Sequence, residues 1–170
     1  MAPRNELRSR PGFRARDENR RTLLIGIGND LRGDDGAGPA VAAAVARRLP
    51  HVETREVHQL VPELADEVAQ ADVVVFVDAS TAVDCVTVRD VAPQPGAGHS
   101  HVATPATILA LCRDAYGKAP AAAWQIEVPA SCFDLGAGLS AETRRGVDDA
   151  AAWIVALVDG AWGAYRYSCL

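Results

Sequence analysis

Hydrophobic and polar residues alternate along the chain in blocks that predict strands and helices in turn. The clearest strand is residues 72–78, Asp-Val-Val-Val-Phe-Val-Asp, whose β-branched and aromatic side chains are typical of a central strand buried on both faces. Residues 23–27 form a second apolar run of strand length, and a looser pattern at 52–57 suits an edge strand. Further strands are predicted at residues 85–91 and 124–128.

Helices are predicted between these strands, at residues 39–49, 63–70, 104–116 and 140–158. Thr104 is a favoured N-cap residue for the third of these helices, and Pro105 suits its first position. Ser140 is a favoured N-cap residue for the last helix. Residues 79–85 are too few for a crossover helix, so the strand that follows them should be antiparallel to its neighbour. The pattern predicts one α/β domain with three layers (α/β/α) and a mostly parallel, mixed sheet of about five strands.

The two ends of the chain differ from this domain in composition. Residues 1–21 contain seven arginines and hardly any apolar side chains, so they cannot bury enough surface to offset the entropy of ordering. We expect a disordered Arg-rich extension at 1–21, a folded domain at 22–160 and an aromatic C-terminal tail at 161–170 without a clear period.

Composition excludes several classes of function. The 170 residues carry a formal net charge of −5, which does not favour nucleic acid or a membrane surface. No apolar run is long enough to cross a bilayer. The four cysteines are scattered without a Cys-x-x-Cys pair, so a zinc knuckle is not indicated and a reduced cytoplasm is the expected compartment.

The loop after the first strand carries the strongest chemical signal. Residues 28–38 contain four glycines and three carboxylates, Asp30, Asp34 and Asp35. Loops at the carboxyl ends of strands in open α/β sheets are where ligands usually bind. Carboxylates there suit a metal ion or an acid/base role better than a phosphate group, which they would repel.

Two other interpretations of this loop remain open. The segment 26–28, Gly-Ile-Gly, begins like a dinucleotide-binding fingerprint, but the third glycine of that pattern falls at Leu31. Asp34 or Asp35 could also simply cap the following helix, since Asp is favoured at N-caps and in first turns.

Two further polar residues are expected at the same edge of the sheet as Asp35. Asp78 ends the third strand, and His101 lies just before a helix that leaves the loop after the fourth. Two carboxylates and an imidazole leave open positions on a divalent ion such as nickel or zinc. Asp78 could instead belong to a turn. His99 competes with His101 as a ligand, and His58 could hold a metal ligand in place without binding the metal itself.

Residues 26–38, Gly-Ile-Gly-Asn-x-Leu-Arg-Gly-Asp-Asp-Gly-x-Gly, closely resemble the opening motif of the [NiFe]-hydrogenase maturation endopeptidases. In that family the second acidic residue, here Asp35, is a metal ligand, and many members have Glu there. The family also has a hydrophobic strand ending in Asp-Ala, here Asp78-Ala79, and a Ser/Thr-His before a helix, here residues 100–101. The likeness of residues 101–109 to the family's helix start favours His101 over His99.

The resemblance implies a cytoplasmic endopeptidase, expected as a monomer, that removes a C-terminal extension from the precursor of a hydrogenase large subunit after nickel insertion. Asp35, Asp78 and His101 are the implied catalytic and metal-binding residues, and the divalent metal is expected to be nickel carried by the precursor. Asp34 could orient a ligand. The sequence has no Ser nucleophile elbow and no His-Glu-x-x-His helix. The alternative is a non-catalytic maturation chaperone that binds the metal or the precursor.

Overall fold

The computed structural model describes residues 20–94 and 103–160, and its centre is a five-stranded sheet. The strand order is β2-β1-β3-β5-β4, and only the pair formed by β4 and β5 is antiparallel. This confirms the predicted mixed sheet, including the antiparallel strand. The strands are β1 (Thr22–Ile27), β2 (Glu53–Val57), β3 (Val73–Ser80), β4 (Thr87–Asp90) and β5 (Ala122–Pro129).

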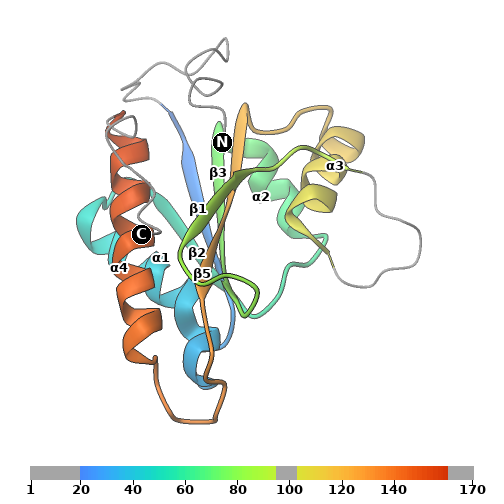
Figure 1. The fold of residues 1–170 in the computed structure, drawn as a ribbon. Coiled ribbons are helices and arrows are strands. Elements are labelled where there is room, and N and C mark those ends of the chain that lie inside the picture. Colours follow the sequence, from blue (N-terminus) through green and yellow to red (C-terminus); the bar gives the residue numbers. More distant parts are fainter. Residues whose placement is uncertain (1–19, 95–102, 161–170) are drawn as a thin grey trace, which may run out of the picture.

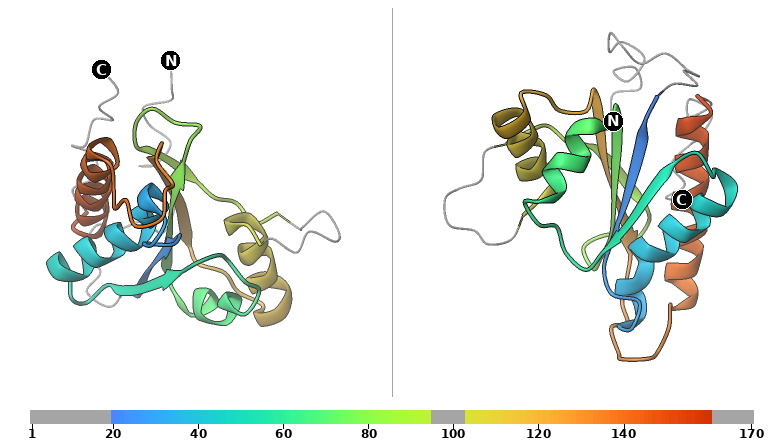
Figure 2. Two further views of the ribbon diagram at one scale, coloured as in Figure 1. Left: turned by 90° about the horizontal axis from the view of Figure 1, so that it is seen from below. Right: turned by 180° about the vertical axis from the view of Figure 1, so that it is seen from behind.

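Helices cover both faces of the sheet, which gives the three predicted layers. One face is covered by α1 and α4 and the other by α2 and α3 (Figure 1), as the left view of Figure 2 shows most clearly. None of the described helices is long and apolar enough to cross a bilayer. The helices are the 3-10 helix η2 (Gly33–Gly36), α1 (Ala37–Arg48), α2 (Leu64–Gln70), α3 (Pro105–Tyr116) and α4 (Ala141–Val158).

Strand β3 divides the core in two. Its side chains alternate, so that Val75 and Val77 join the apolar cluster under α1 and α4, whereas Val74 and Phe76 join the cluster under α2 and α3. All four are fully buried, as predicted for a central strand. The same alternation places Asp78 on the α2/α3 face, just beyond the end of the apolar core.

Hydroxyl groups fix the starts of the two C-terminal helices. Thr104 caps α3, and its Oγ1 accepts a hydrogen bond from the backbone N–H of Thr107 at 3.2 Å. Ser140 caps α4 in the same way through the N–H of Thr143, also at 3.2 Å. Both caps confirm the sequence prediction. The buried Thr143 hydroxyl donates to the carbonyl of Pro129 at 2.8 Å and so ties the end of β5 to the start of α4.

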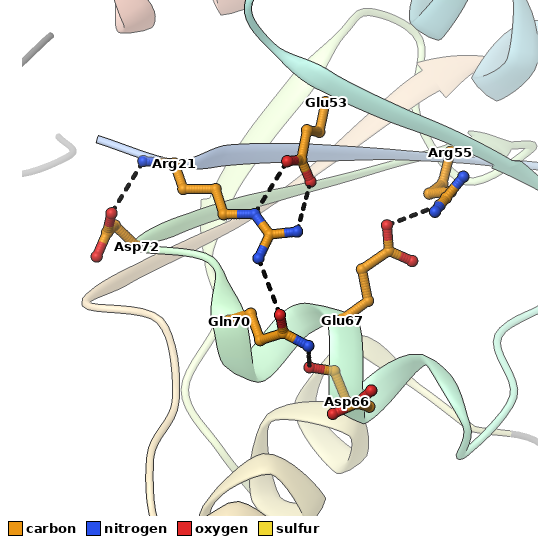
Figure 3. Close-up of polar contacts among 7 residues, drawn as sticks. All are labelled: Arg21, Glu53, Arg55, Asp66, Glu67, Gln70 and Asp72. Carbon is orange, nitrogen blue, oxygen red and sulfur yellow. Dashed lines mark hydrogen bonds and ion pairs between the residues drawn. The ribbon is translucent and has the colours of Figure 1, made fainter. Parts of the chain in front are cut away.

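The described domain includes Arg21, which the sequence prediction assigned to the extension. Its guanidinium group donates two hydrogen bonds to Glu53, at 3.0 and 2.8 Å, and one to Gln70 at 3.2 Å (Figure 3). Its backbone N–H donates to the Asp72 carboxylate at 2.9 Å. Arg21 therefore joins the beginning of β1 to β2, α2 and the start of β3. Residues 1–19 and 161–170 lie outside the described residues.

These contacts predict different effects for two truncations. Deleting residues 1–19 should leave the melting temperature nearly unchanged, because their composition offers little apolar surface to bury. Deleting residues 1–21 should lower the melting temperature, because it also removes the guanidinium group from Glu53 and Gln70. Scanning calorimetry of both truncations and of Glu53→Gln in the full chain checks this, and a large loss from the shorter deletion would contradict it.

Candidate active site

The loop after β1 is closed by hydrogen bonds between its own residues. The N–H of Arg32 donates to the carbonyl of Asn29 at 3.0 Å, and the N–H of Asp35 donates to the carbonyl of Arg32 at 3.2 Å. One carboxylate oxygen of Asp35 accepts the backbone N–H of Asn29 at 3.0 Å. Gly28, at the start of the loop, donates its N–H to Val57 of the neighbouring strand β2 at 2.9 Å. The position of the Asp35 carboxylate is thus fixed within its own loop.

Two glycines allow this loop to lie directly on the sheet. Gly28 has a φ of 134°, and a Cβ atom there would overlap the carbonyl oxygen of Asp35. A Cβ atom at Gly38 would overlap the backbone of Ile27 and would lie 2.7 Å from the carbonyl oxygen of Val77. The glycines of the motif therefore bring Asp35 and the start of α1 against the carboxyl ends of β1 and β3.

Asp78 lies near the end of β3. The half-buried Asp78 carboxylate accepts a hydrogen bond from the N–H of Ala79 at 2.8 Å. Burial raises the pKa of Asp78 to about 6. The negative charges of Asp35 and Glu127 act in the same direction, and the Ala79 N–H acts against it. The fold therefore places the carboxylates of Asp35 and Asp78 within electrostatic reach of each other.

The third predicted site residue, His101, lies outside the described residues, as does its competitor His99. His58 and His51 are exposed. Within residues 20–94 and 103–160, no three His, Cys, Asp or Glu side chains form a group that could hold a metal ion. The described part of the site supplies two carboxylates, and a complete ligand set stays a prediction.

Glu127 is a further carboxylate beside Asp78 that the sequence analysis did not identify. It lies opposite Asp78 in the pairing of β3 with β5, so both side chains point to the same face of the sheet. Its carboxylate accepts a hydrogen bond from the Thr87 hydroxyl at 3.3 Å and forms an ion pair with Arg89 at 3.2 Å. The polar residues that alternate with apolar ones in β5, Gln125 and Glu127, are the signal that could have revealed this side chain.

Asp34, the other acidic residue of the pair, has a structural position. It is fully buried, and its two oxygens accept the backbone N–H groups of Ser131 and Cys132 at 2.9 Å and of Ser140 at 2.6 Å. Burial raises the pKa of Asp34, but these donors outweigh that effect and lower it to about 2. Asp34 therefore holds the loop between β5 and α4 against the loop after β1.

The alternative in which Asp34 or Asp35 caps the following helix is wrong. Neither η2 nor α1 begins with a side-chain cap. The Asp34 carboxylate binds a loop about a hundred residues further along the chain, at sequence separations of 97, 98 and 106 residues. The Asp35 carboxylate binds the N–H of Asn29, which precedes it.

Replacing Asp34 should weaken the fold. Asp34→Asn removes the charge and directs an amide NH₂ group at backbone donors, so we expect unfolding free energy to fall by about 2–3 kcal/mol. The lowered pKa means that the wild-type advantage is complete above about pH 4 and disappears as the pH falls towards 2. Urea unfolding at several pH values measures this. A loss in Asp35→Asn as large as in Asp34→Asn would contradict the assignment.

Asp78 should have the opposite effect on stability. Its pKa in the folded protein is raised, so its contribution to stability is present below about pH 4 and is lost as the pH rises through 6. Asp78→Asn keeps an acceptor for the Ala79 N–H and removes the charge. In chelator-treated protein its melting temperature should exceed that of the wild type, by a margin that grows from pH 4 to 6 and is then constant. Equal melting temperatures at neutral pH would contradict this prediction.

Several solved structures with the same fold are hydrogenase maturation proteases. The [NiFe] hydrogenase maturation protease HybD from Thermococcus kodakarensis is 23% identical, with a TM-score of 0.61 over 81% of this chain and 99% of that one. HybD from E. coli, a hydrogenase maturating endopeptidase, is 18% identical, with a TM-score of 0.65 over 82% and 93%. The maturation protease HycI from T. kodakarensis is 22% identical, with a TM-score of 0.63 over 81% and 92%.

No protein-family model and no curated protein matches the chain. The structural likeness extends over nearly the whole length of the three proteases, so it includes all layers of the domain rather than a shared βαβ unit. The chain therefore has the fold of the [NiFe] hydrogenase maturation proteases.

Proposed function

We propose that the chain is an endopeptidase of this family, which removes a C-terminal extension from the precursor of a [NiFe]-hydrogenase large subunit. One observation carries the proposal: the acidic residues of two separate motif segments, Asp35 and Asp78, lie at one edge of a sheet with the maturation-protease fold.

The two carboxylates fit part of a site for a divalent ion. Oxygen ligands from Asp35 and Asp78, with an imidazole from His101, suit nickel and leave positions open for the substrate. In this proposal nickel arrives within the precursor and is part of what the protease recognises. A divalent ion bound there would polarise the scissile carbonyl or activate water.

Asp35 and Asp78 have different roles in the proposed site. The hydrogen bond from the Asn29 N–H fixes one oxygen of Asp35, which orients the carboxylate before a ligand arrives. Asp78, with a pKa of about 6, is mostly ionised at neutral pH and can hold or release a proton close to that pH. The ion pair with Arg89 offsets the charge of Glu127, so among the described residues of the site Asp35 and Asp78 contribute most of the uncompensated negative charge.

Substitutions of Asp35 test the proposal. Asp35→Asn keeps an acceptor for the Asn29 N–H and loses an anionic ligand, so we expect a normally folded protein whose cleavage of a nickel-loaded precursor falls about a hundredfold or more. Asp35→Glu should keep partial activity, because the longer carboxylate serves at this position in many relatives. Gel analysis of precursor processing measures both variants.

Asp148→Asn is the matched control, since Asp148 is an exposed carboxylate on α4. Its activity should equal that of the wild type. Cleavage by Asp35→Asn at the wild-type rate would remove Asp35 from the site. A wild type that binds the precursor but never cleaves it would instead favour the non-catalytic chaperone.

A further inference from the structure

Two exposed leucines stand beside the candidate active site. Leu31 is 64% exposed and Leu135 is 81% exposed. Among the residues that the structure describes, the only other large hydrophobic side chain with comparable exposure is Tyr116, at the end of α3. Isolated exposed leucines are normal on protein surfaces, but these two lie on loops that a backbone hydrogen bond joins.

The loops that carry these leucines are held together by backbone contacts. The N–H of Gly136 donates to the carbonyl of Leu31 at 2.9 Å, and the N–H of Asp34 donates to the carbonyl of Cys132 at 2.7 Å. The buried Asp34 carboxylate adds its bonds to Ser131, Cys132 and Ser140. The backbone of both leucine-bearing loops is therefore fixed by hydrogen bonds, so these loops lose little conformational entropy when a partner covers the leucines.

A shallow pocket adjoins the same two loops. Its volume is about 270 Å³. Its lining combines small apolar side chains with two carboxylates and includes no lysine or arginine. The apolar lining side chains are Pro39, Ala40, Ala43 and Leu139, and the carboxylates are those of Asp30 and Glu56.

We infer that Leu31, Leu135 and this pocket form a docking surface for the protein substrate. The inference rests on the proposed function and adds the means by which the precursor is held. Leu31 and Asp35 belong to one short loop, so a protein that covers the leucines is positioned over the site. The apolar floor and the carboxylates of Asp30 and Glu56 fit a partner segment with an apolar side chain next to Lys or Arg.

The double variant Leu31→Ser/Leu135→Ser tests the docking surface. In single-turnover cleavage of nickel-loaded precursor, the half-saturating protease concentration should rise about tenfold, while the maximal rate stays unchanged. Both side chains are exposed, so the melting temperature should match that of the wild type. Leu135→Ser alone, at the more exposed position, gives a smaller shift and keeps the test available if the double variant folds poorly.

Two further variants sharpen the test. Tyr116→Ser, which removes the third exposed hydrophobic side chain, should leave both kinetic parameters unchanged. Asp30→Asn/Glu56→Gln should raise the half-saturating concentration and reduce its dependence on salt, because it removes the charges that face a basic partner.

The outcomes separate this inference from the proposed function. If the wild type cleaves the precursor and the leucine variants behave identically, the docking surface is wrong and the protease assignment stands. If the wild type neither binds nor cleaves, the proposed function fails, and the precursor is not the occupant. If light scattering shows that the wild type self-associates and the double variant does not, the surface instead binds a second copy of this chain, which also overturns the inference.

Discussion

The carboxyl edge of this domain depends on one buried carboxylate. Asp34 accepts three backbone N–H groups from a loop that follows β5, and these bonds compensate the cost of burying its charge. Without that anion, the donors of Ser131, Cys132 and Ser140 would face a buried gap. The Asp34 carboxylate thereby holds the loop after β5 and the start of α4 against the acidic loop.

Neighbouring acidic residues of one motif therefore have different chemistry. Asp34 has its oxygens occupied by backbone donors, and its pKa falls to about 2, so it stays a passive anion. Asp35 is half-buried and uses one oxygen to hold its own loop. The loop geometry directs the first carboxylate into the protein and leaves the second near Asp78. This division explains why a pair of acids, rather than one, is useful after β1.

Local sequence patterns were enough to predict most of the fold. The branched run of β3, the caps at Thr104 and Ser140 and the short connection before β4 all depend on near neighbours in the chain. The site was predictable only in part. The role of Asp34, the pairing of Glu127 with Arg89 and the contact between Leu31 and Gly136 arise from segments far apart in sequence. No periodicity encodes such contacts, and the motif resemblance pointed to residues rather than to their partners.

The electrostatics of the site bear on the cation that we propose the substrate carries. Asp78 is half-buried and feels the charges of Asp35 and Glu127, and only Glu127 has an ion pair among the contacts that the structure describes around these three carboxylates. Partial burial and these two neighbouring charges disfavour the ionised form of Asp78 and raise its pKa. A divalent ion would convert this repulsion into attraction, so its binding energy includes the relief of a penalty already built into the fold. A permanent internal cation, such as a second arginine, would remove the penalty and with it part of the affinity. If the substrate carries the divalent ion, as we propose, the carboxylates of the site lose this penalty only when the substrate is bound.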